Sequence, residues 1–348
     1  MVRLQFIDLA KGVAILCVLI GHFMQYSTDS ESMTTRPWLW EFIYSFHMPL
    51  FMFLSGYFIR FDIDVERIKK RIMCLIVPGF LWSSIIAFVL YVLVNYAHFH
   101  NPIEDQTFFL RIFKQFWFLS CLFFCYIAGV TAVNVMKNKV LAFVVSLLLL
   151  MMFCVEEHLH IAFLYPYMWM GFYIRKNNVI EKMLWTHILS LTVAFILLLM
   201  FWSSKYTVYA MPINLLTMTE TGLVFEVENL MITIYRFTLG LCGSILIVSL
   251  CYKASLRYSV WERLKSGGGI LYKIMKWLIS IGQFTISIYI LQKFTLEYAF
   301  KFGHVHMPLI IAYLLFLPAS ILECMCCFYA AKLMIKHKFT RILVGKYN

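Results

Sequence analysis

Three ionisable side chains interrupt the first strongly apolar stretch of the chain, residues 5–26: Asp8, Lys11 and His22. Ionisable groups inside a membrane span are costly unless they face a cavity or a partner, so they are functional candidates by default. On a helix, Lys11 and His22 would lie within about 20° of one face and about 16 Å apart along the axis. That separation resembles the reach of a pantetheine arm. A cation that binds phosphate could therefore hold a thioester beside the histidine.

A structural alternative exists for the same residues. Asp8 and Lys11 are spaced for a local i, i+3 ion pair, and His22 could simply hydrogen-bond a neighbouring helix. A second histidine favours the chemical interpretation. His47 lies near the start of the next apolar segment, residues 42–60, which returns across the membrane and would bring the two imidazoles to one depth. Because histidine titrates near neutral pH, two such groups can share proton transfer.

The elements that must position these residues are predicted to be membrane-spanning helices. Of the 348 residues, 62% are hydrophobic and 14% are charged, and the mean hydropathy is +0.80, which lies far outside the range of soluble globular proteins. We expect an all-α integral membrane protein with about ten transmembrane helices and a single membrane-embedded domain over residues 1–348, with no separate soluble domain. The expected spans are 5–26, 42–60, 73–94, 113–135, 140–155, 161–175, 187–203, 229–252, 277–298 and 308–331.

The net charge of +12 is interpreted as membrane topology and not as nucleic-acid binding. Most of the 30 Lys and Arg residues fall in loops on one side of the predicted spans, and many acidic residues fall on the other side. This distribution follows the positive-inside rule, so both termini are expected to be cytoplasmic. The expected partner of the protein's apolar surface is the lipid bilayer. The ten cysteines lie in apolar stretches and are predicted to be buried thiols.

Further ionisable groups have two interpretations each. Lys69, Lys70 and Arg71 could form a phosphate clamp at the cytoplasmic mouth or only a positive-inside anchor. Ions within predicted spans, which could line a cavity or form structural pairs, are Arg236, Glu297 and Glu323. No metal site is predicted, because three His-x-His pairs in loops supply neither four ligands nor a defined geometry. These pairs are His98/His100, His158/His160 and His304/His306.

The motifs of the first two predicted helices carry a family resemblance. They are Asp8-x-x-Lys11-Gly-x-Ala14 followed by His22, and Ser-Phe-His-Met-Pro-Leu-Phe-x-Phe-x-Ser-Gly-Tyr over residues 45–57. Weaker matches are Trp-Phe-Leu at 117–119, Leu-Phe at 122–123 and Gly-x-x-Thr-Ile-Ser-Ile-Tyr-Ile-Leu at 282–291. The chain resembles the membrane acyltransferase-3 family over nearly its whole length. The His-Met-Pro-Leu-Phe run is most similar to the fucose 4-O-acetylase-like, polysaccharide O-acetyltransferase branch.

The resemblance implies an O-acyltransferase of the bacterial inner (cytoplasmic) membrane that needs no bound cofactor. It would transfer an acetyl group from cytoplasmic acetyl-CoA to a hydroxyl of a cell-surface or exopolysaccharide sugar. His22 would be the general base and His47 would orient it or share the proton, either in direct transfer or through an acetyl-histidine intermediate. The donor-binding candidates are Asp8, Lys11, Lys69, Lys70 and Arg71, and the acceptor-binding candidate is Trp117. The acceptor sugar, succinyl as an alternative acyl group, and the oligomeric state stay open.

Three positions depart from the family pattern. Lys11 stands where many members have Arg, so a donor phosphate would meet a point charge and not a bidentate fork. Gln292 stands where many members have His, and an amide can hydrogen-bond but cannot titrate. A second basic residue usually found nearer the position of Pro78 is absent.

The alternative from another class is a proton-coupled secondary transporter or exporter. Asp8, Lys11, His22 and His47 would then form a proton relay, and no CoA would be needed. Transporters of this size often have two related halves, and we find no counterpart of the histidine-bearing first pair of helices in the second half of the chain. A noncatalytic assembly factor would leave the polar residues of the first helix unexplained.

Overall fold

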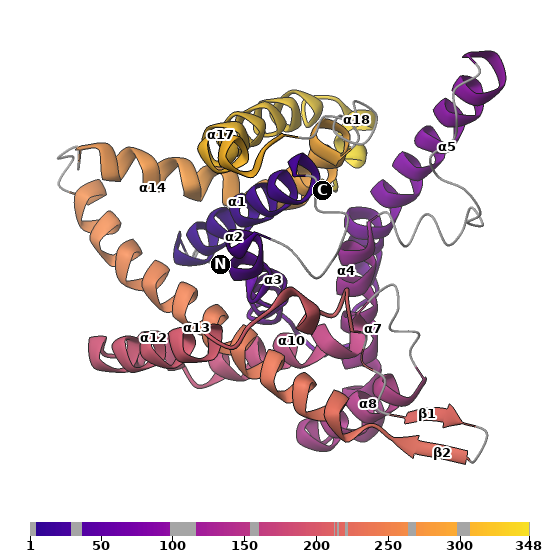
Figure 1. Cartoon of the computed structure of the whole chain (residues 1–348), viewed down its shortest axis with the longest axis vertical. Coiled ribbons are helices and arrows are strands. Elements are labelled where there is room, and N and C mark those ends of the chain that lie inside the picture. Colours follow the sequence, from indigo (N-terminus) through magenta and orange to yellow (C-terminus); the bar gives the residue numbers. More distant parts are fainter. Residues whose placement is uncertain are drawn as a thin grey trace. The chain divides into compact units, whose positions relative to one another are not determined.

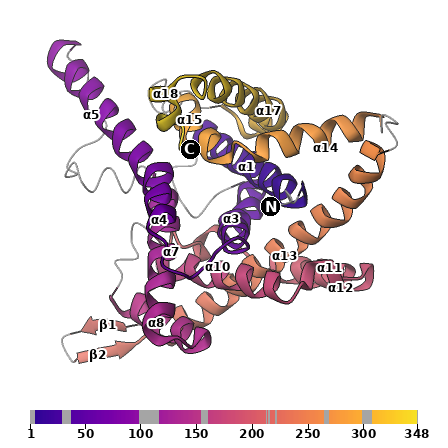
Figure 2. The same ribbon diagram turned by 180° about the vertical axis from the view of Figure 1, so that it is seen from behind.

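The computed structural model forms two compact units. Unit 1 comprises Met1–Ile59 and Ala162–Tyr329, and unit 2 comprises Arg60–Ile161 and Ala330–Asn348. Both units are built mainly from helices (Figures 1 and 2). The structure describes residues 5–28, 37–97, 116–153, 160–211, 213, 216–219, 222–263, 269–297 and 307–347.

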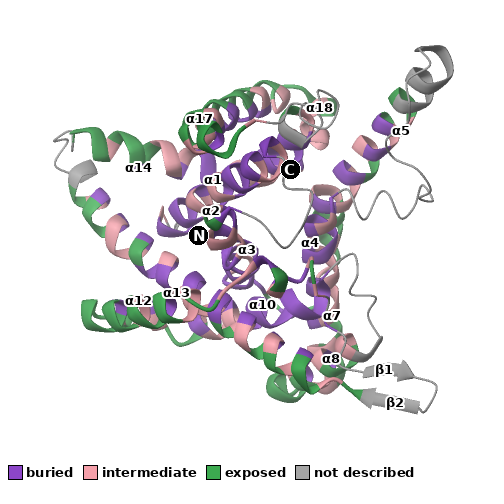
Figure 3. Ribbon diagram, viewed as in Figure 1, coloured by how far each residue is buried: buried purple, intermediate pink, exposed green. Residues whose placement is uncertain are grey.

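Unit 1 surrounds the first helix, α1, most of whose residues are buried (Figure 3). Its helices are α1 (Gln5–Ser27), α2 (Trp38–Tyr44), α3 (His47–Gly56), α10 (Ile161–Lys176), α11 (Val179–Lys182), α12 (Trp185–Leu199), α13 (Val227–Arg263), α14 (Gly269–Gly282), α15 (Thr285–Gln292) and most of α17 (Leu309–Met334). A 3₁₀ turn η2 (Ser204–Tyr206) follows α12, and a π-helical turn η3 (Lys293–Glu297) follows α15.

One β-hairpin interrupts the helices of unit 1. Strand β1 (Leu216–Thr219) pairs antiparallel with β2 (Gly222–Phe225), and the register sets Leu216 opposite Phe225. The sequence predicts an all-α protein and does not predict this hairpin, although threonine and valine in this stretch favour extended backbone. The rest of the described chain is helix, turn or loop, which agrees with the predicted helical class.

Glycines allow α1 to approach α14 closely. A methyl group at Gly12 would collide with the backbone carbonyl of Leu278, and a methyl group at Gly282 would collide with the carbonyl of Asp8. In membrane proteins, small residues at such crossings let two backbones come into direct contact. The polar first half of α1 is therefore fixed against the α14–α15 segment by backbone packing.

The second predicted span, residues 42–60, is not one continuous helix. α2 ends at Tyr44 and α3 begins at His47. The physical reason is Pro49, which has no N–H and whose ring disfavours a helical carbonyl four residues earlier, at Ser45. A second break separates α14 from α15, with a bend of 77° between the two helices. Both breaks lie on elements that contact α1, and irregular backbone at membrane depth is tolerated where protein surrounds it.

Much of α12 and α17 is exposed (Figure 3), and the exposed residues of both helices include many large apolar ones. Leu189 is 65% exposed and Ile310 is 75% exposed, which suits lipid and not water. Five helices in the described chain are long and apolar enough to cross a membrane, or six if α14 and α15 form one bent span. The chain is therefore a multi-pass membrane protein. The count of ten spans, the cytoplasmic termini and the single domain stay predictions.

Unit 2 is also helical. Its elements are α4 (Val65–Arg71), the π-helical turn η1 (Ile72–Ile76), α5 (Val77–Ala97), α7 (Trp117–Met136), α8 (Lys139–Phe153) and α18 (Lys338–Leu343). Asp64 caps α4 by accepting a hydrogen bond from the backbone N–H of Arg67 at 3.1 Å, as expected of an N-cap residue. Trp82 Nε1 donates to the carbonyl of Leu343 at 2.8 Å, which attaches α18 to α5.

Candidate active site

Helix α1 carries Asp8, Lys11 and His22 on one continuous element. Because α1 runs unbroken through this region, the axial separation of about 16 Å between Lys11 and His22 follows from helix geometry. Asp8 is buried, whereas Lys11 and His22 are partly exposed. The helix therefore holds a cation near one end and an imidazole near the other.

His22 is held by a side chain from the last part of the chain. Its Nδ1 lies 2.9 Å from Oε1 of Gln292 at the end of α15. Gln292 is fully buried. Since Gly282 meets Asp8 and Gln292 meets His22, α15 runs along α1 in the same direction. The sequence identifies Gln292 only as a departure from the family pattern, and its contact with His22 appears only in the structure.

His47 lies at the break between α2 and α3. Its Nδ1 donates to the carbonyl oxygen of Ile43 at 2.8 Å, and the residue is 2% exposed. This carbonyl belongs to the last turn of α2 and also accepts a hydrogen bond from the backbone N–H of Phe46 at 3.3 Å. His47 therefore has a structural role at the end of α2 in addition to the chemical role predicted from its sequence position.

Tyr44 connects the surroundings of the two histidines. Its ring packs edge-on against His47, with centroids 4.6 Å apart, and its hydroxyl donates to Oε1 of Gln25 at 2.8 Å. The same ring covers Gly21, directly before His22, where an added methyl group would lie 2.9 Å from Tyr44 Cε2. His22 and His47 are therefore brought to neighbouring positions of unit 1, as the sequence predicts.

Lys11 lies at the opposite end of this arrangement. Its Nζ is 5.5 Å from the centre of the Phe58 ring, and Cζ of Arg175 is 5.3 Å from the same ring. Arg175, in the last turn of α10, donates from Nη1 to the carbonyl of Tyr57 at 2.8 Å. Two cations from helices far apart in the sequence thus approach one aromatic side chain.

Arg175 is the cationic residue that sequence reasoning misses at this end. In the sequence it is one of many basic residues near a span end, and no motif distinguishes it. The neighbouring Tyr57 also donates its hydroxyl to Oε1 of Glu181 at 2.9 Å. This bond attaches the end of α3 to α11, so the segment that ends in Phe58, which both Lys11 and Arg175 approach, is held by tertiary contacts.

The remaining predicted site residues lie in unit 2. Lys69 and Lys70 are exposed on α4, whereas the guanidinium of Arg71 lies 3.9 Å from the centre of the buried Tyr126 ring. Trp117 begins α7, is partly exposed, and meets the ring of His160 edge-on at 5.2 Å. The structure therefore groups Lys69, Lys70, Arg71 and Trp117 in one unit, and Asp8, Lys11, His22 and His47 in the other.

Two carboxylates form ion pairs with Arg67, the basic residue that precedes Lys69, Lys70 and Arg71. Arg67 forms ion pairs with Asp62 at 3.1 Å and with Asp64 at 2.9 Å. The backbone amide of Asp62 and then the Arg67 guanidinium hold the pKa of the Asp62 carboxyl below its ordinary value. Arg67 is thus already paired within unit 2, whereas the exposed lysines that follow it present their charges to solvent.

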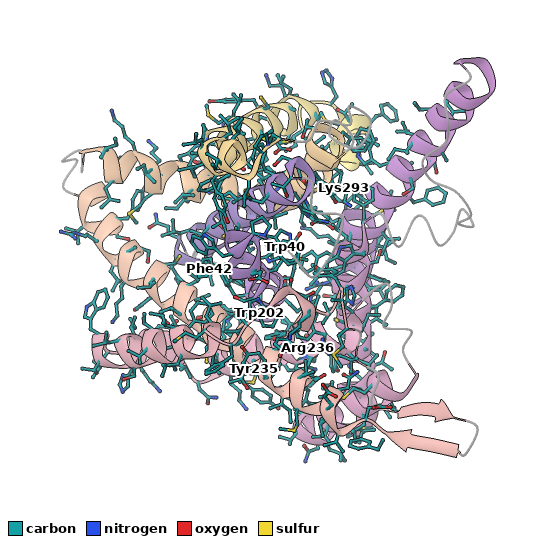
Figure 4. All side chains as sticks on the ribbon, viewed as in Figure 1. Trp40, Phe42, Trp202, Tyr235, Arg236 and Lys293 are labelled. Atoms are coloured by element: carbon teal, nitrogen blue, oxygen red, sulfur yellow. The ribbon has the colours of Figure 1, made fainter. Side chains whose placement is uncertain are left out.

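Two buried ionisable side chains elsewhere in unit 1, Arg236 and Glu323, form hydrogen bonds within the unit. Arg236 on α13, beside Tyr235 (Figure 4), donates to the carbonyl of Met211 at 2.7 Å and to the hydroxyl of Thr233 at 2.9 Å. Glu323 on α17 accepts a hydrogen bond from Thr295 at 2.6 Å. These contacts favour the structural interpretation of both ions.

Two predictions concern side chains beyond the described part of the chain. The side chain of Glu297 lies outside it, as do the histidines at 98, 100, 158, 304 and 306. Among the residues that the structure describes, no group of three His, Cys, Asp or Glu side chains could hold a metal ion.

Comparison with known proteins identifies the family of the chain. Residues 4–329 match the acyltransferase domain of the acyltransferase-3 family. The chain belongs to the acyltransferase-3 family. It is also 26% identical to a nodulation protein NolL of Mesorhizobium japonicum over 58% of this chain and 57% of that protein. The identity to NolL of Sinorhizobium fredii is 25% over 47% of each chain.

The chain spans about half the length of the curated relatives that it matches. No solved structure matches it significantly. Membership of the acyltransferase-3 family supports acyl transfer and does not favour the transporter alternative. Two regions that carry the family resemblance meet in unit 1, because Gly282 contacts Asp8 and Gln292 contacts His22.

Proposed function

We propose that this protein is an O-acetyltransferase that transfers the acetyl group of acetyl-CoA to a hydroxyl of a cell-surface or exopolysaccharide sugar. The observation that carries the proposal is the arrangement along α1. His22 is held against Gln292 at one end, and Lys11 shares the Phe58 ring with Arg175 at the other. Family membership supplies the reaction class, and this arrangement supports particular roles for these residues.

The proposed donor site begins at Lys11 and Arg175. Charge-assisted hydrogen bonds to phosphate are roughly twice as strong as neutral ones, and the Arg175 guanidinium offers the fork geometry that Lys11 lacks. Asp8, one helical turn before Lys11, would help to position its ammonium group. If the diphosphate of CoA is bound here, the pantetheine arm would run along α1 for about 16 Å to reach His22.

Within unit 2, Lys69 and Lys70 are proposed as a second phosphate-binding element. Both are exposed, and neither belongs to the ion pairs that Arg67 forms with Asp62 and Asp64. Arg71 stacks on Tyr126, and this contact would support the end of α4 while its charge adds to the local positive potential.

The proposed chemistry needs one general base and no metal. His22 would take the proton of the sugar hydroxyl as that oxygen attacks the thioester carbonyl. The carbon–sulfur bond then breaks, and the proton passes to the departing CoA thiolate. In the alternative route, His22 attacks the thioester carbonyl first, the carbon–sulfur bond breaks with release of CoA, and the sugar hydroxyl then attacks the acetyl-histidine and displaces the imidazole. His47 would assist by orienting His22 or sharing the proton, while its Nδ1 stays bonded to Ile43.

The acceptor is proposed to contact Trp117. This side chain is partly exposed and meets His160 edge-on, with an interplanar angle of 85°. Aromatic rings bind the apolar faces of sugars by stacking, so a Trp117→Leu variant should raise the KM for saccharide more than the KM for acetyl-CoA. A larger effect on acetyl-CoA would contradict the assignment.

We also propose ten spans in the bacterial cytoplasmic membrane, with both termini in the cytoplasm. The support is the excess of Lys and Arg in alternate loops. Green fluorescent protein fused to the C-terminus should fluoresce, whereas alkaline phosphatase fused there should be inactive. The opposite pair of results would contradict the proposed topology.

The function is tested with radiolabelled acetyl-CoA and membranes that contain equal amounts of each variant. Wild type should produce base-labile acetate on polysaccharide, and His22→Ala and Lys11→Ala should not. His187→Ala and Lys182→Ala are matched controls, because both side chains are exposed and lie outside the proposed site. Label that persists in His22→Ala would exclude this residue from the chemistry. No label in wild type would contradict the proposed function.

A further inference from the structure

We propose that Gln292 is the positioning residue that holds the His22 imidazole with its proton on Nδ1 and its basic lone pair on Nε2. The observation is the 2.9 Å contact between Nδ1 of His22 and Oε1 of Gln292, formed between residues 270 positions apart in the chain. The inference deepens the proposed function, because it assigns the nitrogen that would act as the base.

A second hydrogen bond fixes the orientation of the Gln292 amide. Its Nε2 donates to the carbonyl oxygen of Tyr289 at 3.3 Å, and a carbonyl oxygen can only accept. The amide oxygen must therefore face His22, and an amide oxygen also can only accept. It follows that Nδ1 of His22 carries the proton and donates, so that Nε2 is left as the acceptor.

The surrounding backbone keeps Gln292 in place. It is the last residue of α15, directly before the π-helical turn that begins with Lys293 (Figure 4). The Thr295 hydroxyl donates to the carbonyl of Gln292 at 3.3 Å and to the carboxylate of Glu323 at 2.6 Å. At the other end of the segment, Gly282 is packed against the Asp8 carbonyl. Gln292 is thus anchored on both sides along α1.

A neutral positioning residue has consequences for the base. A carboxylate in this role would stabilise the imidazolium that forms when His22 accepts a proton, whereas an amide holds the tautomer with far less charge stabilisation. Among the described residues, ionisable side chains around this pair include Tyr26 on α1, Glu41 and Tyr44 on α2, and His47 on α3. Others are Tyr289 and Lys293 beside Gln292, and Glu323 and Cys327, which contact Thr295. A Gln292→Glu variant adds one negative charge to this set and leaves the hydrogen-bond acceptor in place.

The first test reads the tautomer directly and needs no activity. Protein labelled with ¹⁵N-histidine is studied by solid-state NMR in lipid bilayers, and the His22→Asn spectrum identifies the His22 signals. In wild type we expect a protonated Nδ1 and an unprotonated Nε2 at a pH where the ring is neutral. Gln292→Leu should produce a mixture of tautomers. A wild-type ring with its proton on Nε2 would overturn the proposal.

The second test separates positioning from folding. Gln292→Leu should lower kcat roughly 10²-fold or more, because a misoriented base loses most of its catalytic contribution, while the KM for acetyl-CoA stays within about threefold of wild type. Gln292→Glu should retain most of the activity, and the acid limb of its rate profile should move to higher pH by about one unit. Gln283→Leu is the matched control, since this glutamine lies in the turn between α14 and α15.

Either of two results would refute the role of Gln292. One is wild-type kcat in Gln292→Leu at equal abundance. The other is loss of activity in both Gln292 variants with an unchanged His22 tautomer, which would indicate a purely structural residue. The two proposals can also fail separately. If wild type shows the expected His22 tautomer but no acetyl transfer, the proposed function is contradicted and the assignment of Gln292 stands.

Discussion

Replacing Gly21 by alanine should disturb the histidine pair with a single added methyl group. That methyl would lie 2.9 Å from Cε2 of Tyr44, whereas carbon atoms in favourable contact are about 3.5–4.0 Å apart. The Tyr44 ring would have to move by roughly 0.5–1 Å to restore that separation. It cannot move freely, because it stacks on Trp40 at 3.7 Å, packs on His47 at 4.6 Å and bonds Gln25 at 2.8 Å.

The magnitude follows from this confinement. Overpacking of this kind costs about 1–3 kcal/mol of stability, which a membrane protein of this size should survive in folded form. A displacement near 1 Å beside reacting groups can lower a rate by about 10²-fold. We therefore expect Gly21→Ala to reduce kcat by roughly 10- to 100-fold and to change the KM for acetyl-CoA much less, because Lys11 and Arg175 lie at the other end of α1.

The assay is acetyl transfer over a range of acetyl-CoA concentrations, with abundance and thermal unfolding measured on the same samples. Gly79→Ala is the matched control, since its methyl group would lie 3.6 Å from the nearest side-chain atoms, those of Phe116, an ordinary contact. Tyr44→Phe should lose less activity than Gly21→Ala, because the ring stays and only the hydroxyl bond to Gln25 is removed. Wild-type kcat in folded Gly21→Ala would refute the role assigned to the Tyr44 ring.

Three further outcomes are expected. Arg175→Gln should raise the KM for acetyl-CoA by about tenfold or more with little change in kcat, because a hydrogen bond to a charged group contributes about 1.5–3 kcal/mol; equal KM values would remove Arg175 from the donor site. Gly12→Val should prevent stable folding, because its side chain would collide with the Leu278 carbonyl, a backbone group that cannot rotate away as a side chain could. The measurement is loss of the monodisperse peak in size-exclusion chromatography in detergent. His47→Leu should lower the unfolding temperature even without substrate, since the Ile43 carbonyl loses one of its two hydrogen bonds and keeps only the one from the Phe46 N–H, a net loss of about 0.5–1.5 kcal/mol; unchanged stability would contradict the structural role.

The arrangement on α1 could be predicted because it depends on short-range geometry. Apolar residues flank Asp8, Lys11 and His22, so the segment is a helix, and helix geometry alone fixes their spacing. The return of His47 to the level of His22 follows from the antiparallel order of two consecutive spans. The helical class and the membrane location follow from composition. Hydrophobic residues make up 62% of the chain, which is too many to bury in the core of a soluble protein.

Sequence spacing could not predict the contacts between distant helices. Gln292 reaches His22 across 270 positions, and Arg175 joins Lys11 at Phe58 from another helix. Such meetings depend on which faces and which turns of two helices come together, and a shift of one residue rotates a side chain by about 100°. The break between α2 and α3 could be predicted only in part. Pro49 indicates where the helix is easily interrupted, but it does not show that the helix ends at Tyr44 and begins again at His47.

The sequence by itself determined which residues of α1 could do chemistry, because their spacing is local and their polarity is exceptional in an apolar segment. Only the tertiary structure decided which partners hold them. The backbone contact of Gly282 with Asp8 sets the position of α15 along α1, and that position brings the Gln292 amide to Nδ1 of His22. Partner choice is therefore a property of how the helices pack.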